Sequence, residues 1–144
     1  MSVLGDKLKN VLADSFTFYL KTHYFHWNVE GENFPQYHSL FDTIYNEVWE
    51  AVDAIAEHIR TLDEYAPGSY NRFGDLASIN TIETIPDAKA MIKALLSDNE
   101  KVMATIKDAI KEAGAADNRG IENFLQDRLD IHAKHGWMLR ATGK

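Results

Sequence analysis

The sequence predicts an all-α protein, a four-helix bundle in which one long crossover joins the two halves. Apolar residues recur every three or four positions in four long segments, which is the spacing of one face of an α-helix. Short Gly- or Pro-containing breaks divide each half, whereas residues 65–86 form a long connection between the second and third segments. With 144 residues, 45% of them hydrophobic, the chain can bury one core, so we expect a single domain over residues 1–144.

The first two helices are bounded by residues that stop or start helical structure. We expect the first helix over residues 3–26, because its apolar stripe ends just before a segment that contains Gly31 and Pro35. The second helix should begin at Pro35, since proline suits the first turn of a helix. Its apolar positions continue to about Glu64.

The second half of the chain holds a short helical turn and two further long helices. Within the connection, residues 73–79 (FGDLASI) could form one helical turn. The third long helix is expected to open at Pro86 and Asp87 and to end around Gly114. The fourth should run over residues 118–140.

Composition excludes several classes of function. The net charge of −7 argues against a general nucleic-acid-binding surface, because phosphate contacts need clustered Lys and Arg. The chain has no cysteine, so disulfides, thiolate chemistry and iron–sulfur clusters are excluded. No apolar run is long enough to cross a membrane and no apolar targeting segment is visible, so the expected location is the cytoplasm.

One face of the second helix gathers residue types that bind metal ions. With about 100° of rotation per residue, Asp42, Asp53 and Glu57 lie at roughly 40°, 60° and 100° from His38. Imidazole and carboxylate groups on one face are what a borderline metal such as iron or zinc requires. Along the helix they form two pairs, roughly 16 Å apart, so one ion cannot touch both pairs.

A two-fold axis resolves this separation. An antiparallel copy would place its Asp53 and Glu57 opposite His38 and Asp42, which creates two equivalent sites shared between subunits. The alternative is a solvated acidic edge, but carboxylates facing each other across a dimer repel unless a cation lies between them. A lone second helix would also expose an apolar surface of the kind that marks interfaces. The residues expected in that surface are Trp49, Val48 and Val52.

The remaining histidines and acids give weaker signals. We expect Glu47 and His58 at the surface, because they fall on the side of the second helix opposite His38. His132 and His135 lie in a charged segment, and we assign them no part in the metal site. The Glu-x-x-His pairs of intrachain di-iron bundles are absent, as are the HExxH, GxSxG, Walker and GxGxxG motifs.

These residues resemble the signature of a known family. The run HWNVEGENF, followed by His38, Asp42, Asp53 and Glu57, is similar to the pattern of the Dps family, the miniferritins or DNA-binding proteins from starved cells. The similarity covers most of the chain, including RLDIHAKHGWMLRA near its end. It implies a ferritin-like four-helix bundle with a short extra helix between the second and third helices. It also implies a hollow dodecameric cage built from two-fold dimers.

The resemblance assigns each metal site to two subunits. His26, His38 and Asp42 would come from one subunit, and Asp53 and Glu57 from its two-fold neighbour. This assignment agrees with the helical spacing, which by itself does not implicate His26.

The activity implied by the resemblance is ferroxidase chemistry with iron storage. The family oxidises ferrous iron, preferentially with hydrogen peroxide, and stores ferric mineral in the cavity, which protects against oxidative stress. Carboxylates and imidazoles suit both iron states, with zinc as a competing ion. Trp27, next to His26, would act as an auxiliary electron donor, as the matching family tryptophan is thought to do. The alternative for Trp27 is packing in the core.

Two other functions stay open on the sequence. Many family members bind DNA through lysine-rich terminal arms, so a DNA-compacting protein with secondary iron chemistry is the main alternative. Here the first ten residues carry only Lys7 and Lys9, offset by Asp6, and the last residues carry only Lys144, so we expect no tight DNA binding at physiological salt. A helical oligomer that binds no metal is the third candidate.

Overall fold

The computed structural model describes residues 2–144, which form five α-helices and no strand. The four long helices are α1 (Val3–Asn28), α2 (Phe34–Thr61), α4 (Ala88–Ala115) and α5 (Arg119–Thr142). The all-α bundle and the extra short helix are confirmed. The short helix, α3 (Tyr70–Leu76), begins earlier than the expected turn at residues 73–79. It begins there because the Ser69 hydroxyl caps its first turn by accepting the backbone N–H of Arg72.

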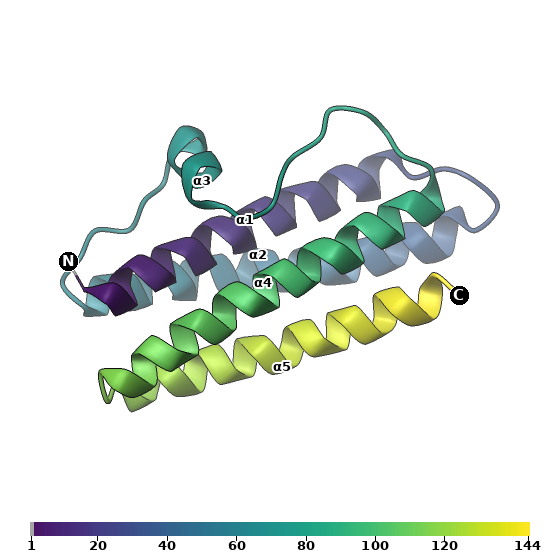
Figure 1. Cartoon of the computed structure of the whole chain (residues 1–144). Helices are drawn as coiled ribbons and strands as arrows, with labels where there is room; N and C mark the ends of the chain where they lie inside the picture. Colours follow the sequence, from purple (N-terminus) through teal and green to yellow (C-terminus); the bar gives the residue numbers. More distant parts are fainter. Residues whose placement is uncertain (1) are drawn as a thin grey trace.

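The long helices form two antiparallel hairpins that pack side by side (Figure 1). A short loop joins α1 to α2, and Gly31 in that loop has a φ of +123°, a conformation that side-chain-bearing residues rarely adopt. The crossover that contains α3 runs from the end where α2 stops to the opposite end, where α4 starts (Figure 1). α1 packs against both α2 and α4, whereas α2 and α5 touch at few points.

The starts of the long helices follow from local hydrogen bonding. The side chains of Ser2, Asp87 and Asn118 each accept a hydrogen bond from the backbone N–H three residues on. α2 carries Pro35 in its first turn, where a missing N–H costs nothing. The helix starts expected at Pro35, Asp87 and Asn118 are therefore confirmed to within about two residues.

Two buried polar side chains of α1 hold the crossover against the bundle. Asp14 accepts hydrogen bonds from the backbone N–H and the hydroxyl of Ser78, at 2.6 and 2.7 Å, and from the Thr105 hydroxyl at 2.6 Å. Lys21 donates to the carbonyl oxygen of Asn80 and forms an ion pair with Asp98 at 2.8 Å. The crossover is therefore anchored to α1 and α4 rather than lying loose over them.

The core is one continuous cluster of apolar side chains, and some large apolar side chains lie outside it. Apolar side chains from all four long helices fill the interior, with Phe18, Phe41, Leu95 and Leu125 fully buried. Trp49 is 51% exposed, as expected, but the expectation that Val48 is exposed is wrong. Val48 packs completely into the core because it follows the inner stripe of α2. Within residues 2–144, no helix has the length and apolar character of a membrane span.

Candidate metal centre

His26 of α1 and His38 of α2 stack on each other where the two helices meet. Their ring centroids are 3.7 Å apart, with 17° between the ring planes. Nδ1 of each ring lies 2.8 Å from the backbone carbonyl oxygen of the other residue. Because a carbonyl oxygen only accepts, each Nδ1 carries a proton, and in the neutral ring Nε2 is then the nitrogen with the free lone pair. This is the tautomer in which Nε2 binds a metal while a hydrogen bond from behind orients the ring.

Asp42 lies one turn beyond His38, on the same face of α2, and is exposed. The side-chain amide of Asn46 donates to its Oδ1 at 3.2 Å. Burial raises the pKa of Tyr45, and the hydrogen bond to Asp42 and its negative charge raise this pKa further. Tyr45 therefore stays protonated, and its hydroxyl is the donor in the hydrogen bond with Asp42.

Asp53 and Glu57 lie exposed further along α2. Asp53 and Trp49 border a shallow, open hollow on this helix. Since α2 is unbroken, Asp42 and Asp53 are separated by about 16 Å along its axis, so the two pairs cannot share an ion in one chain. Across residues 2–144 of a single chain, no three His, Asp or Glu side chains are placed to hold a metal together.

Trp27 lies outside the core, which excludes core packing as its role in this chain. Its side chain is 60% exposed, and its ring lies 4.2 Å from that of His23. The His23 ring stacks on Tyr45 at 3.8 Å and 10°, and the Tyr19 hydroxyl is 3.0 Å from His23 Nδ1. Trp27, His23 and Tyr45 thus form a continuous line of rings that ends at the hydrogen-bond partner of Asp42.

Sequence reasoning gave His23 and Tyr45 no role in the site. Burial lowers the pKa of His23, and the neighbouring His26 lowers it further against the opposing charge of Asp42. His23 is therefore a neutral ring at pH 7. The available signal was the four-residue spacing that puts His23 and Trp27 on one side of α1.

The expectation that Glu47 lies at the surface is wrong, and the two histidines of the charged segment, His132 and His135, lie in the core. His132 is fully buried and His135 is 4% exposed. Glu47 reaches from α2 to α5, where it pairs with Arg128 and His135. His58 is also partly buried, with its ring 4.4 Å from that of Phe124.

The position of these polar residues in the α5 stripe was the missed signal. Residues at three- and four-residue spacing along one side of α5 are all buried, and they include charged ones. The set is Leu125, Arg128, His132, His135 and Leu139. A pattern of apolar residues alone does not reveal its polar members.

Known proteins resemble this chain over nearly its full length. The family model described as a ferritin-like domain matches residues 5–143. An uncharacterized low temperature-induced protein of Nostoc sp. is 34% identical over 136 residues, which are 93% of this chain and 76% of that protein. Antigen TpF1 of Treponema pallidum is 31% identical over 100% of this chain and 82% of its own length. DNA protection during starvation protein 2 of Bacillus anthracis is 28% identical over 93% of this chain and 92% of its own length.

Solved structures show the same fold. The crystal structure of a Dps protein from Bacillus brevis superposes with a TM-score of 0.94 at 27% identity, covering 99% of this chain and 95% of its own. The Dps protein of Vibrio cholerae O1, described as a member of a broad superfamily of ferritin-like diiron-carboxylate proteins, gives a TM-score of 0.92 at 28% identity over 98% of this chain and 89% of its own. This chain belongs to the Dps family of the ferritin-like superfamily.

Proposed function

We propose that this protein oxidises ferrous iron with hydrogen peroxide and stores the ferric product inside a dodecameric cage. The sites are shared: His26, His38 and Asp42 of one subunit face Asp53 and Glu57 of its two-fold neighbour. The observation that carries the proposal is the division of these groups between the two ends of one unbroken helix face. Each chain alone holds two incomplete halves, and a two-fold axis across α2 completes both halves at once.

The state of the side chains supports this assignment. The Nδ1 atoms of His26 and His38 both donate to carbonyl oxygens, so Nε2 is the atom of each neutral ring that can bind a metal. Asp42, Asp53 and Glu57 are exposed carboxylates, and imidazole with carboxylate is a donor set suited to iron. Trp49, exposed between the two pairs, offers apolar surface for the contact between subunits.

The proposed reaction balances without a further reductant. Two ferrous ions each give up one electron, and one hydrogen peroxide takes both electrons and two protons to form two water molecules. Two irons supplied together let peroxide accept both electrons at once, so hydroxyl radical is not released. The chain contributes anionic oxygens that stabilise the higher charge of the ferric product.

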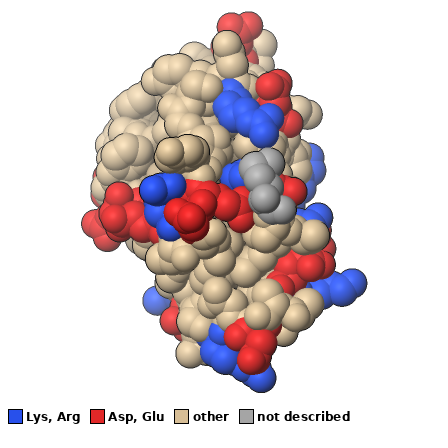
Figure 2. All heavy atoms as spheres, turned by 90° about the vertical axis from the view of Figure 1, so that its left-hand side faces the viewer, with Lys and Arg blue, Asp and Glu red and all other residues tan. Residues whose placement is uncertain are grey.

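The Bacillus anthracis relative is named for DNA protection, and we propose that protection here is chemical rather than by DNA binding. Lys9, one of the two lysines near the start of the chain, is buried and pairs with Glu64 at 3.2 Å. On the face drawn in Figure 2, Lys and Arg lie among Asp and Glu rather than in a continuous basic patch. With a net charge of −7, such a surface gives little attraction for phosphate.

The test is peroxide-driven ferrous oxidation by the purified protein, followed by the absorbance of the ferric product. His38→Ala and Asp53→Ala should each lower the initial rate by at least roughly tenfold, the cost of losing even an outer-shell partner of a metal ligand. Glu100→Ala, an exposed acid on α4, is the matched control and should oxidise iron like wild type. Zinc accepts the same donors but has no redox chemistry, so it should inhibit the reaction.

Two outcomes would contradict the proposal. One is an unchanged rate in both ligand variants, which would place the oxidation elsewhere on the chain. The other is a stable monomer in light scattering at neutral pH, because a monomer leaves both halves of the site incomplete.

A further inference from the structure

A second group of metal-binding residue types lies inside the bundle, away from the outer face of α2. Glu47 Oε1 lies 3.1 Å from Arg128 Nη2 and 2.8 Å from His135 Nε2, and Oε2 of Glu47 contacts Arg128 Nη1. Arg128 Nη2 also lies 3.2 Å from Nε2 of His132. Arg128, His132 and His135 are each at most 4% exposed. One buried guanidinium is therefore in direct contact with a carboxylate and an imidazole, and a second imidazole is bound to the same carboxylate.

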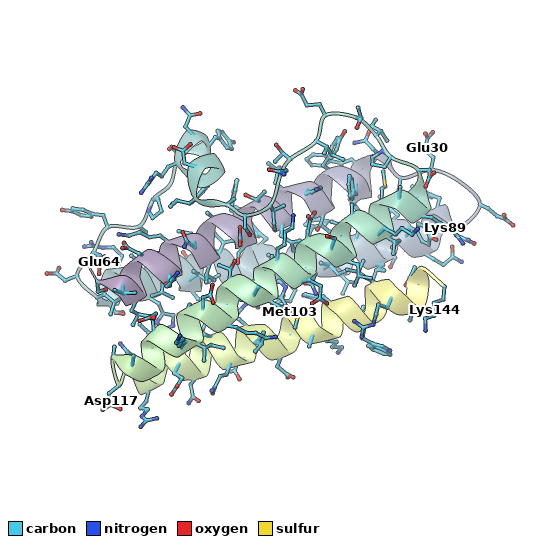
Figure 3. All side chains as sticks on the ribbon, in the orientation of Figure 1. Glu30, Glu64, Lys89, Met103, Asp117 and Lys144 are labelled. Carbon is cyan, nitrogen blue, oxygen red and sulfur yellow. The ribbon has the colours of Figure 1, made fainter. Side chains whose placement is uncertain are left out.

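Asn99 of α4 fixes the proton on His132. Its side-chain N–H donates to the His132 carbonyl oxygen at 2.9 Å, so its Oδ1 is the atom that lies 2.8 Å from His132 Nδ1. Nδ1 therefore donates, and Nε2 presents its lone pair to Arg128, which can only donate. Burial lowers the pKa of His132, and the charge of Arg128 lowers it further, so the ring is neutral. Asn99 lies one turn from Met103, labelled midway along α4 in Figure 3.

Glu47, His132 and His135 are residue types that bind metal ions. Carboxylate and histidine side chains on facing helices are the groups that helical bundles use for metals in their cores. One Glu with two His is also the protein ligand set of several zinc sites. The hydrogen bond from Asn99 to His132 Nδ1 is the kind of support that orients a metal-binding imidazole. In this protein the guanidinium of Arg128 lies among these three side chains, and it is permanently charged, so it supplies a positive charge where a metal ion would otherwise do so.

We propose that Arg128 is a built-in cation that takes the place of a metal ion among Glu47, His132 and His135, three groups that as placed here do not hold a metal, and so closes the bundle core to metal ions. Nε of Arg128 is buried and has no hydrogen-bond partner among the described residues. The guanidinium thus neutralises the carboxylate without being fully satisfied itself, and a buried polar atom without a partner requires an explanation. Metal ions would then be confined to the outer face of α2.

The test is to replace Arg128 with an uncharged residue of similar length. Arg128→Met is made in a parent protein that carries His38→Ala and Asp42→Ala, so that the outer face no longer contributes metal binding. Cobalt(II) serves as the optical probe and zinc is titrated by calorimetry. Arg128→Met should gain one tightly bound ion per chain, with the visible bands of a histidine-ligated cobalt ion. The parent, and a matched Arg128→Lys variant that keeps the positive charge, should show no such ion.

Two further variants locate the gained ion. Adding His135→Ala to Arg128→Met should abolish the gain, whereas adding His58→Ala, a partly buried histidine outside the cluster, should leave it intact. No gain in Arg128→Met, or a gain that survives His135→Ala, overturns the proposal. The result does not depend on the shared outer site, because the parent already lacks two of its proposed ligands.

Folding of the variant is part of the test. Arg128→Met leaves Glu47 without its main cation, so the metal-free variant should be less stable than the parent. Zinc should then raise the thermal midpoint of Arg128→Met and leave that of the parent unchanged, since binding only to the folded state is stabilising. A variant that stays unfolded with zinc present also overturns the proposal.

Discussion

At the scale of single residues, His26 and His38 depend on each other. Each ring donates to the carbonyl oxygen of the other residue, so the orientation of both rings is set by how α1 meets α2. Spacing along the second helix could predict the face on which His38 lies, because that information is local. It could not predict His26, which lies on another helix and entered only through the family resemblance.

Trp27→Phe tests the electron-donor role at this scale. Because Trp27 is 60% exposed, the substitution removes little packing, and iron binding and ferrous oxidation should continue. Phenylalanine is much harder to oxidise than tryptophan, so stray oxidising equivalents should appear as more spin-trapped radical. Trp137→Phe, at a ring 58% exposed on α5, is the control and should leave the radical yield unchanged. Equal radical yields in wild type and Trp27→Phe would leave Trp27 without a donor role.

At the scale of the helix, α2 could be predicted in extent but not in all its contacts. Its start at Pro35 and its apolar stripe depend on neighbours in sequence, and the structure confirms both. The role of Glu47 depends on Arg128 and His135, far away in the chain. A charged residue near the core is recognisable only once its partner is placed, because its burial becomes favourable only with that partner.

Glu47→Gln tests the tie between α2 and α5. Burial alone would raise the pKa of Glu47, but hydrogen bonds from His135 and Arg128 outweigh it and lower the pKa from its ordinary 4.5 to about 2. The substitution should cost about 1–3 kcal/mol at pH 7, less than for a fully buried pair because the Glu47 side chain is 30% exposed.

The pH dependence of this loss gives the sharper measurement. A lowered carboxyl pKa stabilises the folded state above the unfolded pKa, and this stabilisation fades as the pH falls from about 4.5 toward 2. The difference in thermal midpoint between wild type and Glu47→Gln should therefore shrink over that range. Glu100→Gln, at an exposed position, should show no difference from wild type at neutral pH. A difference that is constant with pH would mean that the Glu47 charge does not stabilise the fold.

At the scale of the whole molecule, charge predicts the behaviour toward DNA. A protein with net charge −7, and with Lys9 already paired to Glu64, should not retard linear duplex DNA at about 0.15 M salt and neutral pH. The measurement is a gel shift with micromolar protein. Retardation would point to a basic surface, for which Lys7→Ala and Lys144→Ala are the first variants to compare.

The proposed metal site requires two chains, because its ligands come from two subunits. Helical spacing places His38 with Asp42 and Asp53 with Glu57 on one face, and the structure has all four on one unbroken helix. Their meeting across a two-fold axis is a property of two chains. The separation of about 16 Å between the two pairs of one chain leads to this arrangement when each ion is bound by one pair from each subunit.

Complementation between two inactive variants tests that meeting. One variant carries His38→Ala with Asp42→Ala, and the other carries Asp53→Ala with Glu57→Ala. Alone, each should lose ferroxidase activity, because every shared site then lacks half of its ligands. Co-expression produces heterodimers in which one site lacks both halves and the other keeps both. About half of the wild-type activity per heterodimer should therefore return, since one two-fold axis generates two equivalent sites.

The control is a mixture made from separately purified and unexchanged variants, which should stay inactive. A site built within one chain predicts no recovery under any mixing, because no chain in the mixture has all four residues. Recovery therefore requires that Asp53 and Glu57 of one subunit act with His38 and Asp42 of another. Inactive co-expressed assemblies, shown by mass spectrometry to contain folded heterodimers, would mean that the antiparallel pairing of α2 is wrong and that the exposed Trp49 surface joins subunits in another register.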